Sequence, residues 1–272
     1  MFNGLSNAHL YTALQIGVEF QLRDQAAFAT KSGTAFCVRN RAGVSCIVTN
    51  RHMLDAGYNE PSGKFLGATL SSLWIDGFQT TAGDANAKPV NRVTFDVQLA
   101  PGAVRFAANY FEDVACLINP VVRVRGGGLA SIGFFVDSDY LADDTWIEQQ
   151  LSICDFVAFP GFPPWHDRLE NRPILRTGTI SSDPRANYSD TSTSKGRRIA
   201  YEAFSFGGSS GSPVFATEKG IRSTAEIITT GFREGRLVGI NAGHLEGDYQ
   251  AHSGISFFVK SSAILELING DA

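Results

Sequence analysis

One stretch of the sequence indicates both the fold and the chemistry of this chain: Phe206-Gly207-Gly208-Ser209-Ser210-Gly211-Ser212-Pro213-Val214-Phe215. Glycines around a serine permit a sharp turn that exposes the hydroxyl and lets backbone amides converge on one point. Pro213 then ends the turn, and the apolar residues after it return the chain to a strand. A loop of small residues alone is more often a plain turn. The pattern glycine-x-serine-glycine-small-proline favours a nucleophile instead, and in this register the nucleophile is Ser210.

A serine nucleophile needs a general base, and the stretch Cys46-Ile47-Val48-Thr49-Asn50-Arg51-His52-Met53-Leu54 offers His52 just past an apolar strand. A neutral imidazole can accept the proton of a hydroxyl that is scarcely ionised near neutral pH. The other histidines occupy an N-terminal segment, a Pro/Trp loop and a Gly/Asp-rich turn: His9, His166, His244 and His252. His52 is therefore the candidate base.

The third stretch is Tyr110-Phe111-Glu112-Asp113-Val114-Ala115-Cys116-Leu117-Ile118. An acid directly before an apolar strand can lie below the surface beside a histidine, where it fixes the tautomer and stabilises the imidazolium. Asp113 is the candidate for this role. Asp96 has a similar but weaker local pattern, and Asp139 lacks a following apolar run.

The rest of the chain reads as many short strands. Apolar runs are cut by glycine, proline and asparagine about every ten residues, which favours an all-β fold with two barrels of near-equal size. We expect short helices over residues 8–15 and 261–268. The predicted division is an N-terminal segment at 1–27, a first barrel at 28–125, a linker at 126–150, a second barrel at 151–260 and a C-terminal helix at 261–272.

Composition excludes several classes of protein. The chain has 272 residues, of which 18% are charged, and a net charge of −4, which argues against disorder and against nucleic acid as a partner. No apolar run approaches the roughly 20 residues that cross a membrane, and the start of the sequence does not resemble a secretory leader. The four cysteines lack metal-site spacing, so we expect no metal and no cofactor, but reduced, buried thiols and a cytoplasmic location.

Together, the three stretches resemble the chymotrypsin-like serine peptidases, in particular bacterial trypsin-like domains outside the digestive enzymes. The resemblance extends over roughly residues 28–259 and rests on Thr49–His52, Asp113–Leu117 and Gly208–Pro213. It implies two six-stranded antiparallel β-barrels with the site in the cleft between them. It also implies a serine endopeptidase that acts on protein or peptide substrates through an acyl-enzyme. His52, Asp113 and Ser210 would form the triad, and the amides of Gly208 and Ser210 the oxyanion hole.

Two positions depart from the family pattern. Ser209 stands where digestive relatives carry the aspartate that pairs with a newly cleaved N-terminus, so we expect activity without N-terminal cleavage. Control would then come from assembly, from loop ordering (the polar segment 183–198 is a candidate gate) or from a separate activating or targeting protein. Ser212 stands where glycine is usual, a small change that should be tolerated.

By the same resemblance, the specificity pocket is lined by Phe204, Asn241, Ala242, Gly243 and His244. Since Phe204 replaces the acid of trypsin-like enzymes, arginine or lysine before the scissile bond is not expected, because burying that cation unpaired is costly. His244 is either a contact for a Glu or Gln side chain or a solvated turn residue.

Two other interpretations stay open from the sequence. Residues Gly207–Gly211 also fit the G-x-S-x-G pattern of a nucleophile elbow, in which Ser209 would be the nucleophile. A nucleophile elbow requires a helix directly after the serine. The chain could also be an inactive peptidase-like module that binds proteins, because a fold does not guarantee its function.

Overall fold

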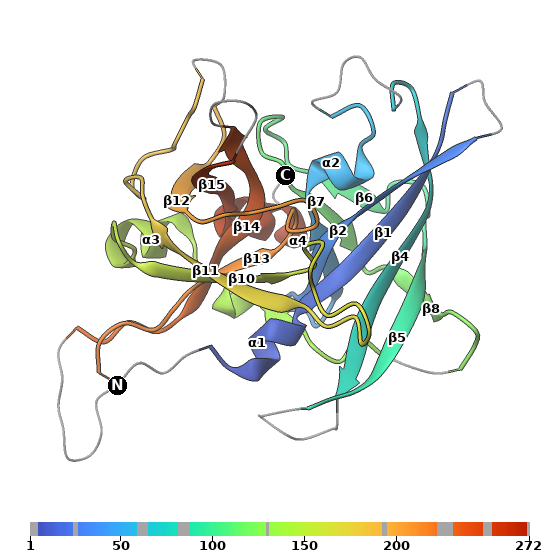
Figure 1. The fold of residues 1–272 in the computed structure, drawn as a ribbon, viewed down its shortest axis with the longest axis horizontal. Coiled ribbons are helices and arrows are strands. Elements are labelled where there is room, and N and C mark those ends of the chain that lie inside the picture. The colour runs from blue at the N-terminus through green and yellow to red at the C-terminus, as the bar shows by residue number, and fades with distance from the viewer. Residues whose placement is uncertain are drawn as a thin grey trace.

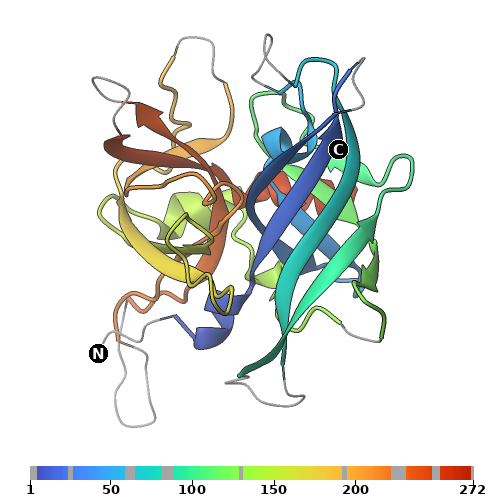
Figure 2. The ribbon, with the colours of Figure 1, turned by 45° about the vertical axis from the view of Figure 1, so that its right-hand side comes forward.

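The computed structural model describes residues 5–23, 27–58, 65–80, 88–128, 131–191, 195–221, 231–246 and 252–270. Strands dominate, and they gather into two units that lie side by side in both views (Figures 1 and 2). The described helices are short: α1 (Asn7–Tyr11), α2 (Arg51–Leu54), the 3-10 helix η1 (Ser138–Tyr140), α3 (Asp144–Gln150) and α4 (Ser261–Asn269). The all-β class predicted from the sequence is confirmed.

The first unit is a curled sheet. Its strands are β1 (Ala13–Gln21), β2 (Phe28–Arg39), β3 (Ser45–Thr49), β4 (Thr69–Thr80), β5 (Pro89–Gln98), β6 (Val104–Phe106), β7 (Ala115–Ile118), β8 (Val121–Val124) and β9 (Val136–Asp137). They follow the order β6-β7-β3-β2-β1-β4-β5-β8, and β9 pairs in parallel with β2. In the described residues this sheet does not close, so it differs in detail from the six-stranded barrel that the family resemblance implies.

Strand β1 occupies part of the segment expected to be helical. Helix α1 ends at Tyr11, and β1 begins two residues later. The cause is an alternating pattern: Leu14, Ile16, Val18 and Phe20 are all buried on the core side, as period-two burial requires. Residues 13–21 therefore lie inside the first sheet, between β2 and β4, and not in a separate N-terminal segment.

The second unit is a closed barrel of six strands: β10 (Phe156–Gly161), β11 (Ile174–Ile180), β12 (Arg198–Glu202), β15 (His252–Lys260), β14 (Arg236–Glu246) and β13 (Pro213–Ala216), in that order around the barrel. All described pairings within it are antiparallel. Its interior is filled by large apolar side chains such as Phe159, Tyr201 and Phe258, each almost fully buried. The predicted second barrel is thus confirmed.

Helix α4 holds the two units together. It begins at the predicted Ser261 and ends at Asn269, and the next residue, Gly270, has a φ of +83° that suits glycine. The apolar face of the helix (Ile264 and Leu267) packs in one cluster with Cys116 from β7 and Phe215 from β13. Figure 2 shows this red helix behind the seam between the sheet and the barrel.

The connection between the units contains β9, η1 and α3, and residues 129–130 of the predicted linker lie outside the described residues. Cys37, Cys46 and Cys116 are buried free thiols, whereas Cys154 is exposed. Burial raises the pKa of the Cys37 thiol to about 12, which keeps it protonated. None of the helices in the described part of the chain has the length and apolar character needed to span a bilayer.

Candidate active site

His52 and Asp113 form a tight pair at the upper end of the first unit. Strand β3 ends at Thr49, and α2 places His52 on its first turn (Figure 1). The His52 backbone N–H donates to Asp113 Oδ1 at 2.9 Å, and His52 Nδ1 lies 2.6 Å from Asp113 Oδ2. Asn50 Nδ2 also donates to the Asp113 carbonyl at 2.7 Å. The acid that precedes β7 is therefore fixed on both carboxylate oxygens by the residue it was predicted to serve.

This arrangement sets the imidazole tautomer. An ionised carboxylate can only accept hydrogen bonds, so the proton sits on Nδ1 and Nε2 is left as an acceptor. The Asp113 side chain is 7% exposed and that of His52 is 28% exposed. The pair thus combines a shielded carboxylate with an imidazole that solvent or substrate can reach.

Ser210 belongs to the second unit but is bonded to the first. The Thr34 N–H in β2 donates to the Ser210 carbonyl at 2.9 Å. A Cβ added to the neighbouring Gly33 would lie 3.1 Å from Met53 Sδ and 3.3 Å from the Ser210 carbonyl oxygen. The Ser210 carbonyl and Met53, the residue after His52, therefore both lie beside Gly33 of β2. In the described residues no direct hydrogen bond joins Ser210 Oγ to the His52 ring.

The loop around Ser210 depends on two glycines in the left-handed region. Gly208 has φ +87° and Gly211 has φ +86°. A Cβ would lie 2.2 Å from the Phe162 carbonyl oxygen at Gly208, and 1.9 Å from that of Thr34 at Gly211. No other residue type fits there. Within the described ranges, the amides of Gly208 and Ser210 donate to no protein acceptor, so both remain available for an oxyanion.

Three side chains, those of Arg176, Asn241 and Tyr201, hold this loop through hydrogen bonds. The sequence did not identify any of them in this role. Arg176 donates to Ser209 Oγ and, at 2.6 Å, to the Phe204 carbonyl. Asn241 Nδ2 donates to the Ser209 carbonyl at 2.9 Å, and Tyr201 Oη donates to Asn241 Oδ1 at 2.7 Å. Ser209 is fully buried. The uncharged Ser209 side chain and its carbonyl are therefore held by a hydrogen-bond network that includes the Arg176 guanidinium.

Ser212, the second departure from the family pattern, is accommodated by a glycine in the neighbouring strand β10. Its side chain is fully buried, and a Cβ at Gly161 would lie 2.3 Å from Ser212 Oγ. Glycine at position 161 thus accommodates the larger residue at position 212.

The residues predicted to line the specificity pocket divide into two groups. Asn241 is buried and fully bonded within the protein, while Ala242 and Gly243 are half-buried on β14. Phe204 is 58% exposed and lies beside Phe206 (centroids 6.5 Å apart) and His252 (5.1 Å). His244 is exposed and stacks on His252 at 4.3 Å.

Further rings extend this surface beyond the predicted residues. Trp165 is 53% exposed and meets Phe206 edge to face at 4.5 Å. Burial, and then the neighbouring His244, lower the pKa of His252. We call Trp165, Phe204, Phe206, His244 and His252 the aromatic surface. Exposed rings on either side of a glycine-rich loop were the only sequence signal for it.

The remaining candidates have other partners. Both ring nitrogens of His166 are engaged, by the Pro163 carbonyl at 2.7 Å and by Asn171 Oδ1 at 3.0 Å. Asp96 pairs with Arg125, and Asp139 pairs with Arg41. In the described residues 195–221 no helix comes directly after Ser209, because β13 begins at Pro213, and this removes the nucleophile-elbow interpretation.

The comparison with family models agrees with this geometry. Residues 33–221 match the model of the trypsin-like peptidase domain. That range contains His52, Asp113 and Ser210 as well as strands β10, β11, β12 and β13 of the closed barrel. A search of curated proteins gives no significant match. Since the matched residues make up more than half of the chain, the chain belongs to the family of trypsin-like peptidase domains.

Proposed function

We propose that this chain is a serine endopeptidase in which His52, Asp113 and Ser210 form the catalytic triad. The observation that carries the proposal is the bonding of both Asp113 carboxylate oxygens to His52, at 2.9 and 2.6 Å, on the side of the seam where Ser210 is bonded to β2. Each residue comes from a separate part of the chain, so the fold has to bring them together.

The proposed reaction is acyl transfer to Ser210. Its Oγ attacks the peptide carbonyl carbon while His52 Nε2 takes the hydroxyl proton. The tetrahedral intermediate collapses, the C–N bond breaks, and His52 returns the proton to the leaving amine. Water then attacks the acyl-enzyme, again with His52 as base, and releases the carboxylic acid and Ser210.

Two backbone amides and one carboxylate lower the barrier in this scheme. The amides of Gly208 and Ser210 donate hydrogen bonds to the oxyanion. These hydrogen bonds strengthen as the carbonyl becomes tetrahedral and its oxygen gains negative charge. Asp113 holds the imidazole in the productive tautomer and stabilises its positive charge without taking the proton.

We propose that the aromatic surface receives an apolar side chain of the substrate. Phe204 stands where a cation-binding acid would stand, and Phe204, Phe206 and Trp165 are 58%, 37% and 53% exposed. Exposed aromatic rings of this size bind apolar groups, and the aromatic surface includes no carboxylate to form an ion pair with an arginine or lysine side chain. Activity without N-terminal cleavage also belongs to the proposal, supported by the uncharged Ser209, whose hydroxyl and carbonyl are already bonded by Arg176 and Asn241.

Location and partners complete the proposal. Buried free thiols at Cys37, Cys46 and Cys116 support a reducing, cytoplasmic compartment. We keep a separate activating or targeting protein as a proposed partner. Whether this partner is required is tested by comparing the peptidase activity of the purified chain with that of the same chain in cell extract.

The test is a mass-spectrometric map of cleavage sites in a peptide library exposed to the wild type and to Ser210→Ala. We expect cleavage by the wild type only, with large apolar residues enriched before the scissile bond. Strong enrichment of arginine or lysine would contradict the specificity proposal alone. Equal maps for the two proteins, or no cleavage by folded wild type even in extract, would contradict the enzymatic proposal and favour a binding module.

A further inference from the structure

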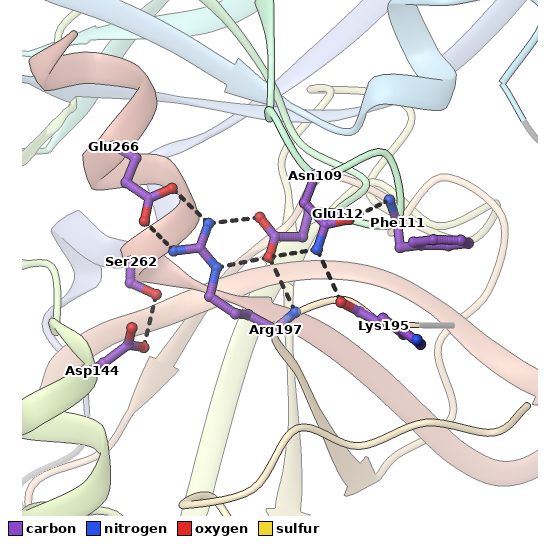
Figure 3. Close-up of polar contacts among 8 residues, drawn as sticks. All are labelled: Asn109, Phe111, Glu112, Asp144, Lys195, Arg197, Ser262 and Glu266. Carbon is purple, nitrogen blue, oxygen red and sulfur yellow. Dashed lines mark hydrogen bonds and ion pairs between the residues drawn. The ribbon is translucent and has the colours of Figure 1, made fainter. Parts of the chain in front are cut away.

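A buried ion pair joins the two units directly beside the triad acid. Glu112 precedes Asp113 in the first unit, and its side chain is 2% exposed. Arg197, which precedes β12 of the barrel, donates from Nε to Glu112 Oε1 and from Nη2 to Glu112 Oε2, both at 2.7 Å. The Arg197 backbone N–H adds a third bond to Oε1 at 3.2 Å. Figure 3 shows the guanidinium lying edge-on to the Glu112 carboxylate.

Arg197 is itself held from the other side. Its Nη2 donates to Glu266 Oε2 in α4 at 2.7 Å, and its Nη1 is bonded to Glu266 Oε1. The Lys260 N–H donates to the Arg197 carbonyl at 2.9 Å. The arginine therefore spans from the C-terminal helix to the segment that bears Asp113 (Figure 3).

The backbone of this segment makes the same crossing. Asn109 Nδ2 donates to the Lys195 carbonyl at 2.9 Å, and Arg198 Nη2 donates to the Phe111 carbonyl at 3.0 Å. A Cβ at Gly196 would lie 2.9 Å from the Phe111 carbonyl oxygen, so the backbones of the two segments are in close contact. The end of the segment first considered as a gate, 195–198, is thus bonded to residues 109–112, while residues 192–194 lie outside the described residues.

Asp113 is mechanically tied to Glu112. The Val114 N–H donates to the Glu112 carbonyl at 2.8 Å, which makes Asp113 the central residue of a three-residue turn. A rotation of the Glu112 peptide would carry the Asp113 carboxylate with it. The His52 pair requires that carboxylate within hydrogen-bond range on both of its oxygens.

We propose that Arg197 is a positioning residue for the triad acid: by fixing Glu112 across the seam, it orients Asp113 toward His52. The expected loss of activity rests on the proposed function, whereas the expected change in the His52–Asp113 geometry does not. This role of Arg197 makes the triad sensitive to the docking of the two units, because the acid of the first unit is oriented by a side chain of the second.

The test uses full-length Arg197→Met and Arg197→Lys, with Arg185→Met as the matched control. Arg185 lies, like Arg197, between strands β11 and β12. Its side chain forms an ion pair with Asp183 and is 71% exposed. The first readout is the low-field proton NMR resonance of His52 Nδ1–H, recorded in a Ser210→Ala background to prevent self-cleavage. We expect it to broaden or shift upfield in Arg197→Met, to recover in part in Arg197→Lys, and to be unchanged in Arg185→Met.

The second readout is kinetic, with Ser210 present. A misplacement of about 1 Å costs on the order of 100-fold in rate, so kcat per titrated site should fall to that degree in Arg197→Met while KM changes little. A role in stability alone would lower the titre of active sites and leave kcat per site unchanged. If Arg197→Met does not fold, Arg197→Lys and Glu112→Gln carry the same comparison.

An unchanged resonance in folded Arg197→Met, or an unchanged kcat per active site, would overturn the inference. The two proposals fail separately. A resonance that depends on Arg197 in a chain without Ser210-dependent hydrolysis would support the positioning role and refute the proposed activity.

Discussion

The Thr34 N–H donates to the Ser210 carbonyl at 2.9 Å, across the seam between the sheet and the barrel. The Thr34 side chain adds two more bonds: Oγ1 donates to the Gly208 carbonyl at 2.6 Å and accepts from the Phe162 N–H at 3.2 Å. One residue of β2 thereby fixes the peptide planes on both sides of the proposed oxyanion hole.

Thr34→Val keeps the size of the side chain but removes both hydroxyl bonds. Leaving buried polar groups without a partner costs about 1–3 kcal/mol. If that cost falls on the transition state, kcat/KM drops by roughly tenfold to a hundredfold. Thr34→Ser, which keeps the hydroxyl, serves as the control and should stay within about threefold of the wild type. Equal kinetics for the valine and serine variants would exclude this role.

Gly208 and its neighbour Gly207 provide a matched pair. Gly208 has φ +87° and no room for a Cβ, whereas a Cβ at Gly207 meets nothing within 4 Å. Gly208→Ala should therefore distort the loop and lower kcat by at least about 100-fold, and Gly207→Ala should be nearly neutral. Both are measured by peptide hydrolysis on protein whose folding is checked by circular dichroism. Similar losses in the two variants would mean that the loop conformation described here is wrong.

Asp113→Asn tests the tautomer argument. An amide in place of the carboxylate can donate to His52 Nδ1, which favours the unproductive tautomer with its proton on Nε2. We expect kcat to fall by about 10⁴-fold, the size of the effect known for triad enzymes, with the fold unchanged. Asp96→Asn is the control, because Asp96 of β5 forms its ion pair with Arg125 and not with His52. A loss of less than tenfold in Asp113→Asn would argue for another acid.

His9 predicts a pH dependence of stability. Its ring packs against Phe215 at 4.9 Å and Tyr140 at 5.3 Å, and burial lowers its pKa from the ordinary value of 6.5. As pH falls through that value, the unfolded chain binds the proton before the folded chain does, so stability decreases toward acid pH. His9→Gln should lose less thermal stability than the wild type between pH 7.5 and 5.5. Identical losses in Tm for the two proteins would refute this assignment. Part of the slope should remain, since burial also lowers the pKa of His252.

The second barrel and the three stretches with functional residues could be predicted because their signals are local. Short apolar runs between turn residues predict strands, and the glycine pattern around Ser210 is a property of ten consecutive residues. The structure brings His52 and Asp113 into contact as the sequence suggested, and it places Ser210 beside the same seam. Their catalytic roles remain predictions.

The first sheet was harder to predict because its elements depend on pairing over long distances. Strand β1 continues directly from a short helix, and its alternating apolar residues were obscured by the helix-forming residues before Ala13. Whether a sheet closes depends on strand pairing and stagger, which no local pattern specifies. That is why a nine-stranded curled sheet stands where a six-stranded barrel was expected.

Contacts between distant charged residues could not be predicted at all. Arg197 and Glu112 are 85 positions apart, and each looks like an ordinary surface residue in the sequence. Arg176, which supports Ser209 from β11, is equally inconspicuous. Their roles follow from burial and from partners that only the folded chain supplies.

The central claim is that Ser210 is a nucleophile activated by His52. The most direct measurement is the intact mass and peptide map of the protein after treatment with a fluorophosphonate. We predict one adduct, on the peptide that contains Ser210, absent in Ser210→Ala and formed at least about 10³-fold more slowly in His52→Ala. A folded wild type that forms no adduct, or that carries it on another residue, would contradict the account.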